Sequence, residues 1–269
     1  MDRHVATRGL ATLLGLVTGL LLLGAGCSDT ARTQQLVVGM ELSYPPFEMR
    51  DESGEAAGVS VDLARALAHR LGRELVVENL PFDGLIPALK TGRIDLVISS
   101  LTQTPERSES IDFSEPYLQT GLCLLLHRDS PVTSITNLDT AGRKVAVKKG
   151  TTGHAYAVEH LRHAQMLVLD AESAAVLEVV QGKVDAFLYD QMSTFKHWSE
   201  NRETTRAALA PFQVEHWAIG VRKGNDSLRR DVNTFLALYR AEGGFDELGD
   251  RWLREAKEAF EAAGLEFLF

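Results

Sequence analysis

One arginine stands where it could bind a carboxylate. Thr104 suits the cap of a helix and Pro105 its first residue, so Arg107 falls in the first turn of a short helix. A guanidinium can hold a carboxylate through two parallel hydrogen bonds, which a lysine cannot do. The alternative is an exposed arginine that pairs with Glu106 or Glu109, and composition alone favours this alternative.

Two further segments could hold polar groups of a small molecule. The turn 150–153 precedes a predicted helix, so its backbone N–H groups and the hydroxyls of Thr151 and Thr152 would face an anion. Asp190 ends an apolar strand, and a carboxylate at such a place can pair with a buried ammonium. The simpler interpretations are a plain turn between strand and helix, and a cap for the helix after Asp190.

Alternating strands and helices must position these residues. Apolar runs predict strands at 36–39, 75–77, 94–98, 145–147 and 166–169. Between them, apolar stripes predict helices at 61–71, 85–89 and 154–162. This alternation predicts parallel sheets and the α/β fold class. The last part of the chain returns to helix.

Two stretches of the chain repeat one pattern. Residues 85–96 and 176–186 each read as an apolar helix, a glycine, a basic and a β-branched residue, an aspartate and an apolar strand. The repeat suggests two lobes built alike. Ligands of open α/β sheets bind beyond the carboxyl ends of the strands, which here are 99–102 and 189–190. If the lobes face each other, these ends line the cleft between them.

The N-terminus predicts export. Arginines precede an uncharged stretch, 9–26, that has the length of a signal-peptide core and is short for a membrane span. We therefore expect a cleaved signal at 1–26, with a membrane anchor that stays attached as the alternative. Cys27 resembles the lipid-bearing cysteine of a bacterial lipoprotein, although Gly24 stands where such signals usually carry Leu, Val or Ile. Plain secretion is the alternative to lipidation.

Charge and cysteine content exclude several classes. The net charge of −9 argues against a nucleic-acid partner, which would need a basic face. Apart from Cys27 only Cys123 remains, so an internal disulfide framework is excluded and Cys123 is expected in the core. The histidines show no ligand-like spacing with cysteines or carboxylates, so we predict neither a metal site nor a cofactor.

Several short segments form an ordered set between Leu36 and Leu253. They are Tyr44–Glu48, Gly58–Ala64, Asp83–Leu89, Thr102–Arg107, Asp112–Tyr117, Gly150–Gly153 and Ile219–Gly224. Through them the chain resembles the polar-amino-acid family of bacterial periplasmic solute-binding proteins, which deliver ligands to ABC importers. Each segment alone is a weak signal, but their order along one chain agrees with the α/β alternation.

The resemblance implies a two-lobed fold, each lobe a mostly parallel sheet flanked by helices, joined by a two-strand hinge. Residues 36–122 and 218–269 would form lobe 1, 123–217 lobe 2, and 27–35 a tether after the signal. The resemblance also implies export to the periplasm or the outer face of the cell membrane, with Cys27 as the only attachment to a membrane. The partners would be a polar L-amino acid and the membrane subunits of an ABC importer, and we expect a monomer.

The resemblance assigns residues to the constant end of such a ligand. Arg107 would bind the α-carboxylate, helped by Ser100 and Thr102 of the first lobe. Thr151 and Thr152 would meet the same carboxylate from the second lobe. The family therefore implies an anion site with contributions from both sides of the cleft.

Asp190 would bind the ammonium of the same ligand. Because Arg107 and Asp190 lie in different lobes, one zwitterion can bridge them and favour closure. By the same resemblance, the rings of Tyr44 and Phe82 would sandwich the aliphatic part of the ligand. As isolated aromatic residues, both could equally belong to the core.

Two charged residues would face the variable end of the ligand. The resemblance places Glu41 and Lys148 there. A basic ligand suits Glu41 but is repelled by Lys148, whereas an amide can use both, which favours glutamine or a similar polar amino acid. The alternative is a solvent-facing Lys148 that simply pairs with Glu41.

Two other functions stay open. Some periplasmic dehydratases that act on prephenate-like acids look like these proteins, but such a site needs a general acid or base. Glu41 and His154 are the only additional candidates for that role, and the pair of Arg107 and Asp190 suits a zwitterion better than a dicarboxylate. The second alternative is a receptor subunit that binds the same ligand and reports to a signalling partner. We expect a protein that is not an enzyme.

Overall fold

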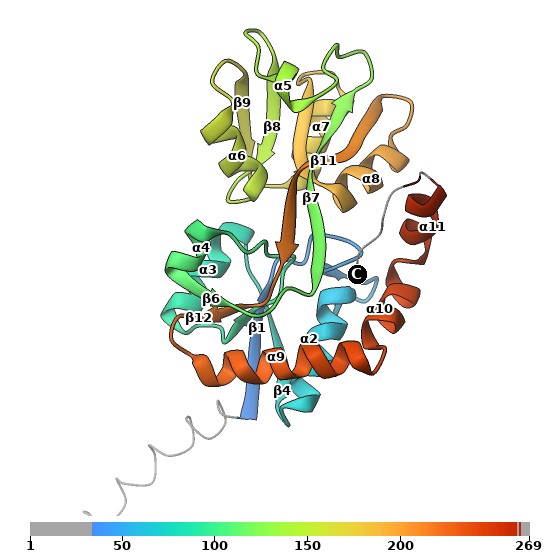
Figure 1. Cartoon of the computed structure of the whole chain (residues 1–269). Coiled ribbons are helices and arrows are strands. Elements are labelled where there is room, and N and C mark those ends of the chain that lie inside the picture. The colour runs from blue at the N-terminus through green and yellow to red at the C-terminus, as the bar shows by residue number, and fades with distance from the viewer. Residues whose placement is uncertain (1–33, 263, 265–269) are drawn as a thin grey trace, which may run out of the picture.

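Two five-stranded sheets organise the chain, and each forms the centre of one lobe (Figure 1). The computed structural model describes residues 34–262 and residue 264. The predicted signal peptide at 1–26 and Cys27 lie outside the described residues, as does nearly all of the predicted tether. Among the described residues, no helix is both long enough and apolar enough to cross a membrane.

The sheet of the first lobe has the strand order β4-β1-β5-β12-β6. Its strands are β1 (Gln35–Met40), β4 (Glu74–Asn79), β5 (Leu96–Val97), β6 (Ile111–Phe113) and β12 (Gly220–Arg222). β1 pairs parallel with β4 and β5, as the alternation predicts, while β12 runs antiparallel between β5 and β6. The helices of this part are α2 (Val59–Arg70), α3 (Phe82–Thr91), α4 (Pro105–Ser110), α9 (Asp226–Ala241) and α10 (Gly244–Trp252). A small ribbon joins β2 (Met49–Arg50) to β3 (Ala56–Ala57).

The sheet of the second lobe has the order β11-β7-β10-β8-β9. Its strands are β7 (Leu118–His127), β8 (Lys144–Lys148), β9 (Gln165–Leu169), β10 (Ala186–Asp190) and β11 (Thr205–Trp217). Its helices are α5 (Ile135–Leu138), α6 (Thr152–His160), α7 (Glu172–Val180) and α8 (Gln191–Glu200). β8 pairs parallel with β9 and β10, and β7 runs antiparallel to both β10 and β11.

The strands β7 and β11 connect the two lobes (Figure 1). They pair antiparallel, with a register shift between Ala208 and Gln213. At the lower end of this ribbon Trp217 forms a bridge to Thr102, which belongs to the first lobe. The two-lobed fold with a two-strand hinge is thus as predicted. Of the predicted lobe boundaries, the one after residue 122 falls within β7 and the one after residue 217 falls at the end of β11.

The repeated sequence pattern has a structural counterpart in both lobes. α3 and α7 are each followed by a glycine, Gly92 and Gly182, with φ of 74° and 67°, a left-handed conformation that favours glycine. Asp95 then accepts a hydrogen bond of 2.9 Å from a backbone N–H of β1, and Asp185 one of 2.8 Å from a backbone N–H of β8. In each lobe the aspartate therefore ties the turn after the helix to the neighbouring strand.

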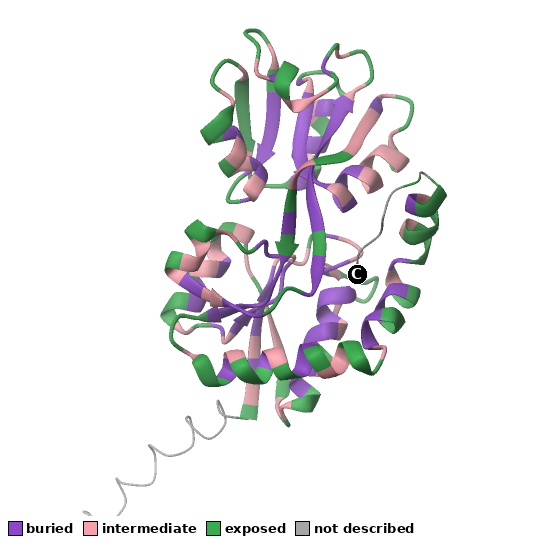
Figure 2. Cartoon of the chain, in the orientation of Figure 1, coloured by how far each residue is buried: buried purple, intermediate pink, exposed green. Residues whose placement is uncertain are grey.

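Buried side chains fill the interior of both lobes and the base of the hinge (Figure 2). The apolar stripe predicted for the first helix is confirmed, because Val61, Ala64 and Leu67 of α2 are completely buried. Cys123 is completely buried in β7, as predicted, and burial raises the pKa of its thiol. The strands β7, β8 and β10 are mostly purple in Figure 2, while the edge strand β9, the outer helices and the loops carry exposed residues.

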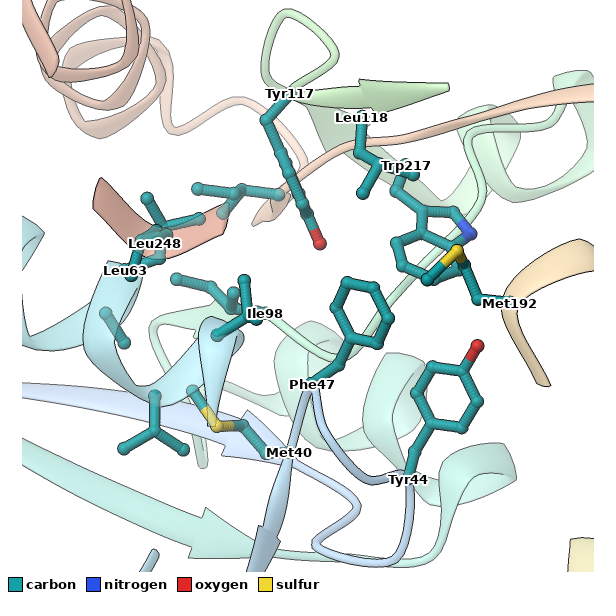
Figure 3. Close-up of a cluster of buried hydrophobic side chains, with 14 of the residues drawn as sticks. Met40, Tyr44, Phe47, Leu63, Ile98, Tyr117, Leu118, Met192, Trp217 and Leu248 are labelled. Atoms are coloured by element: carbon teal, nitrogen blue, oxygen red, sulfur yellow. The ribbon is translucent and has the colours of Figure 1, made fainter. Parts of the chain in front are cut away.

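An aromatic cluster lies where the hinge meets the first lobe (Figure 3). The ring of Phe47 stacks on Tyr44 with centroids 5.5 Å apart and meets the edge of Trp217 at 5.0 Å. Tyr117 is also buried in this cluster. Because aromatic rings bury large areas in a defined geometry, the cluster fixes the loop that carries Tyr44 against the hinge strand.

The last helix reaches from the first lobe to the second. α11 (Arg254–Ala262) follows α10, which packs on α2 of the first lobe. Phe260 of α11 is buried and meets the edge of Phe195 of α8, with ring centroids 4.9 Å apart. The C-terminal helix therefore contacts the second lobe beside the hinge (Figure 1).

Candidate functional site

The predicted site residues come together in one pocket between the lobes. All of them except Lys148 line it: Glu41, Tyr44, Phe82, Ser100, Thr102, Arg107, Thr151, Thr152 and Asp190. Lys148 reaches the same place through Glu41 and the ring of Phe82. The pocket is also lined by Ser99 and Tyr189, which belong to the strand ends predicted to face the cleft. Four further lining residues had no predicted role: Glu48, Leu122, Glu215 and Trp217.

Arg107 reaches across the cleft from the first turn of α4. Thr104 caps this helix, as predicted, by accepting a hydrogen bond of 3.1 Å from the backbone N–H of Arg107. The guanidinium donates from Nη1 to the carbonyl of Thr102 at 2.6 Å and from Nη2 to the carbonyl of Gly150 in the second lobe at 3.0 Å. It lies 5.6 Å from the ring centroid of Phe82. Burial lowers its pKa to about 10, so Arg107 stays charged at neutral pH.

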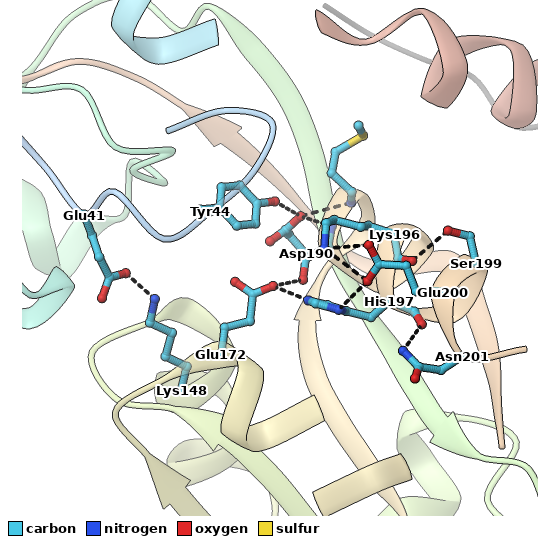
Figure 4. Close-up of polar contacts among 12 residues, drawn as sticks. Glu41, Tyr44, Lys148, Glu172, Asp190, Lys196, His197, Ser199, Glu200 and Asn201 are labelled. Atoms are coloured by element: carbon cyan, nitrogen blue, oxygen red, sulfur yellow. Dashed lines mark hydrogen bonds and ion pairs between the residues drawn. The ribbon is translucent and has the colours of Figure 1, made fainter. Parts of the chain in front are cut away.

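Asp190 is both a helix cap and a wall of the pocket. Its carboxylate accepts hydrogen bonds of 3.0 Å from the backbone N–H groups of Met192 and Ser193, which is the capping role considered as the alternative. The hydroxyl of Tyr44 donates to the same carboxylate at 2.7 Å from the first lobe (Figure 4). Burial raises the pKa of Asp190 to about 7, against the lowering effect of the Tyr44 hydrogen bond.

Lys148 and Glu41 form an ion pair across the cleft (Figure 4). The lysine ends β8 in the second lobe and is only 1% exposed, so it does not face solvent. Its Nζ lies 5.6 Å from the ring centroid of Phe82. The pairing considered as an alternative is therefore present, but it is made inside the protein.

The threonines of the two lobes do not have equivalent contacts. Thr151 caps α6 by accepting from the backbone N–H of His154, and its hydroxyl donates to the carbonyl of Lys148 at 2.7 Å. Thr152 and Thr102 instead both donate to Oε2 of Glu215, each at 3.1 Å. Hydroxyls from both lobes thus converge on a carboxylate of the hinge strand.

Ser100 lies beside a buried carboxylate of the same lobe. Its φ of 48° is left-handed, which is uncommon for a residue with a side chain and indicates that its surroundings hold it there. The carboxylate of Glu48 accepts hydrogen bonds from Ser60 at 2.6 Å, Ser100 at 3.2 Å and Ser99 at 3.4 Å. Burial raises the pKa of Glu48 to about 8. Glu48 therefore underlies the loop that carries the predicted ligand-binding serine.

These buried carboxyl groups predict how stability depends on pH. The folded protein holds protons on Asp190 and Glu48 up to about pH 7 and 8, whereas the unfolded chain releases them near pH 4. Since the folded state binds more protons in this window, its stability must fall as the pH rises. We expect the ligand-free protein to melt at a lower temperature at about pH 8.5 than at about pH 6, as measured by circular dichroism.

Glu48→Gln provides the control for this prediction. It keeps the size of the side chain and removes one titrating group, so its melting temperature should fall less over the same pH interval. A wild-type protein that melts at the same or a higher temperature at the alkaline pH would contradict the prediction.

Comparison with known proteins identifies the family. The sequence model of the bacterial extracellular solute-binding proteins, family 3, matches residues 36–255. The chain belongs to this family.

Curated relatives of this solute-binding family cover most of the chain. The L-cystine-binding protein TcyJ of Escherichia coli is 29% identical over 217 residues, which are 81% of this chain and 82% of the relative. The L-arginine-binding protein of Pseudomonas aeruginosa is 29% identical over 248 residues, 89% and 95% of the two chains. The glutamine-binding protein GlnH of Bacillus subtilis is 29% identical over 225 residues, 82% of each.

Solved structures of binding proteins share the two-lobed fold. An ancestral arginine-binding protein bound to arginine has a TM-score of 0.76 and 33% identity, over 82% of this chain and 98% of that one. The ancestral amino acid-binding protein AncCDT-1, a precursor of cyclohexadienyl dehydratase, has a TM-score of 0.76 and 33% identity, over 83% and 97%. The two-lobed solute-binding fold is therefore common to this chain and its structural relatives.

Two of the residues missed by the sequence analysis carry charge. Glu48 belongs to the segment Tyr44–Glu48, which was used only as a mark of resemblance. Glu215 could have been found from alternation along β11, because Trp217 is buried while Val214 and His216 are exposed. This period of two turns Glu215 inward with Trp217.

Proposed function

We propose that this protein captures a polar L-amino acid between its lobes and delivers it to the membrane subunits of an ABC importer. The observation that carries the proposal is the placement of Arg107 and Asp190 in one pocket, on different lobes. Amino acids combine a carboxylate with an ammonium, and these two side chains have the complementary charges. The names of the relatives, which include binding proteins for cystine, arginine and glutamine, agree with this ligand class.

A zwitterion that bridges the lobes would stabilise the closed form. Arg107 would turn its two donors from backbone carbonyls to the α-carboxylate, joined by Ser100, Thr102, Thr151 and Thr152. Such contacts are complete only when the lobes meet, and a ligand shifts a conformational equilibrium by its differential affinity for the two states. Binding and closure would therefore be one event.

Asp190 would pair with the ligand's ammonium, and aromatic rings would enclose the rest of the ligand. Tyr44 already contacts Asp190 and packs against the hinge cluster, so its ring is held at the pocket wall. Phe82 begins α3 and faces both cations of the site, Arg107 and Lys148. An aliphatic stem between these two rings would be shielded from water.

The ion pair of Glu41 and Lys148 supports a neutral polar side chain in the ligand. Because the two charges already satisfy each other, a charged side chain would have to break the pair. An amide can accept from Lys148 and donate to Glu41 without breaking it. Glutamine or a similar polar amino acid is the ligand that this arrangement favours.

Lys148→Met provides a prediction about this specificity. Removing the lysine frees the carboxylate of Glu41 for a cationic side chain, so we expect the affinity for L-arginine and L-lysine to rise at least tenfold relative to L-glutamine, about 1.4 kcal/mol. Calorimetric titration of both variants with the three amino acids measures the ratio. Lys149→Met is the matched control, because Lys149 is half exposed and pairs with Asp83 outside this ion pair. An unchanged ratio in Lys148→Met would contradict the assignment of this end of the pocket.

The enzymatic alternative has little support at the two positions considered for acid–base chemistry. Glu41 is engaged by Lys148. His154 lines the neighbouring groove rather than this pocket, and its Nδ1 faces the backbone N–H of Gly150 at 3.4 Å. We therefore propose a binding protein and not an enzyme. A receptor subunit would share the same ligand site and differ only in its partner.

Localisation forms part of the same proposal. We propose a monomer that is exported by the signal at 1–26 and held at a membrane surface through a lipid on Cys27, in the periplasm or on the outer face of the cell membrane. The predicted lobes, 36–122 with 218–269 and 123–217, would then be free to open and close above the tether.

A thermal-shift screen of the mature protein against the common L-amino acids and several organic acids tests the function. We expect one polar amino acid to raise the melting temperature. Turnover of a cyclic organic acid, without a response to any amino acid, would refute the proposal.

A further inference from the structure

Glu215 occupies the place where the two lobes offer hydroxyl donors. The residue belongs to the hinge strand β11 and is 3% exposed. Its Oε2 accepts from Thr102 of the first lobe and Thr152 of the second, and Gln213 donates to its Oε1 at 3.2 Å. These two threonines are the same residues that the proposed function assigns to the ligand's α-carboxylate.

Ligand capture would therefore bring a second carboxylate to one anion site. Arg107 lies close enough to Glu215 to stabilise its negative charge. In the complex, the guanidinium of Arg107 would bind the ligand's carboxylate instead. Two carboxylates that share a site cannot both stay ionised without a large cost, so one of them takes a proton. The ligand's α-carboxyl is the stronger acid and would be held by the guanidinium, which leaves Glu215 as the group that becomes neutral.

We propose that Glu215 takes up one proton when the protein captures its amino acid, and then donates a hydrogen bond to the ligand's carboxylate. The proposal rests on the proposed function. One proton moves from water to the carboxylate of Glu215, and no other bond forms or breaks. Burial raises the pKa of Glu215 in the ligand-free protein, against the lowering effect of its hydrogen-bond donors and of Arg107, and engagement of Arg107 by the ligand would raise it further.

Other titratable groups lie near Glu215 and could also exchange protons when the ligand binds, so they determine the pH and the controls of the experiment. Arg107 of α4 faces it, and Asp190 at the end of β10 and Cys123 of β7 lie close enough to interact electrostatically with it. Asp190 would release a proton as it binds an ammonium, but above its pKa of about 7 this release is small. His154 of α6 and His216 of β11 line the adjoining groove and need a control.

The test is calorimetric titration at about pH 8 in two buffers of different ionisation enthalpy. The titrant is the common L-amino acid that gives the largest thermal shift. We expect the wild-type protein to take up about one proton per amino acid bound, and Glu215→Gln to take up none. The dissociation constant of the wild type should rise about fivefold from pH 7 to pH 8, because ionisation of Asp190 offsets part of a tenfold effect, while that of Glu215→Gln should fall by no more than about twofold.

Equal proton counts in the wild type and Glu215→Gln would overturn the proposal. So would a wild-type count near zero, which decides the question even if Glu215→Gln does not fold. His154→Gln and His216→Gln should keep the wild-type count, and loss of the uptake in either would place the proton elsewhere. If no amino acid binds at all, the proposed function itself fails, and that result is distinct from binding without proton uptake.

Discussion

Replacing Arg107 with alanine is expected to weaken amino-acid binding by about a hundredfold or more. The guanidinium offers two charge-assisted hydrogen bonds to the α-carboxylate, at about 1.5 kcal/mol each, so their loss costs on the order of 3 kcal/mol. The effect on folding should be small, because no residue of the short helix α4 belongs to the buried core. Calorimetric titration of the purified variants measures the change in dissociation constant.

Arg107→Lys separates charge from geometry. Lysine keeps the positive charge but donates from one point, so it should recover only part of the lost affinity. Arg65→Ala is the matched control, since Arg65 is an exposed arginine that pairs with Asp62 on α2 and does not line the pocket. If Arg107→Ala bound the amino acid with a dissociation constant within about threefold of wild type, the assignment of Arg107 to the ligand's carboxylate would be wrong. Such a change corresponds to less than about 1 kcal/mol of binding free energy.

Asp190→Asn is expected to lose binding to a similar extent without losing stability. Asparagine can still cap α8, but it carries no charge to pair with an ammonium. The ligand-free variant should be at least as stable as wild type at about pH 8, since the substitution removes a buried carboxylate whose pKa is raised to about 7. Calorimetric titration with the amino acid measures the dissociation constant, and thermal denaturation at that pH measures the stability.

Asp190→Ala tells the two roles of this residue apart. Alanine removes the cap as well as the charge, so the variant should lose about 1 kcal/mol of stability in addition to the affinity. It also leaves the buried hydroxyl of Tyr44 without its acceptor. If Asp190→Asn bound the amino acid normally while Asp190→Ala did not, the residue would be a structural cap and not the partner of the ligand's ammonium.

Much of the fold follows from local sequence patterns. The alternation of strands and helices identified the parallel strands of both sheets, and the repeat ending in Asp95 and Asp185 marked corresponding turns in the two lobes. These features depend on residues close in sequence. The short strand β12 was not predicted, because the three residues Gly220–Arg222 become a strand only between β5 and β6.

Site residues that belong to a local sequence motif could be predicted, whereas contacts between residues far apart in the sequence could not. Arg107 was indicated by its motif and Asp190 by its place at a strand end, and the structure places both at the pocket. The pairing of Thr102 with Glu215, which are 113 residues apart, depends on the hinge strand and has no local signature. Burial of Lys148 likewise depends on closure against Glu41, which belongs to the other lobe.

The position of β12 determines the order in which the lobes can be completed during folding. The second sheet is built from one continuous stretch, 118–217, so it can assemble as soon as that stretch is available. The first sheet must wait for residues 220–222, because β12 lies between β5 and β6 and without it the sheet is split. Pairing over such a long separation is slow to form. The N-terminal lobe is therefore the last to become complete, and a chain cut short before β12 would present unpaired strand edges.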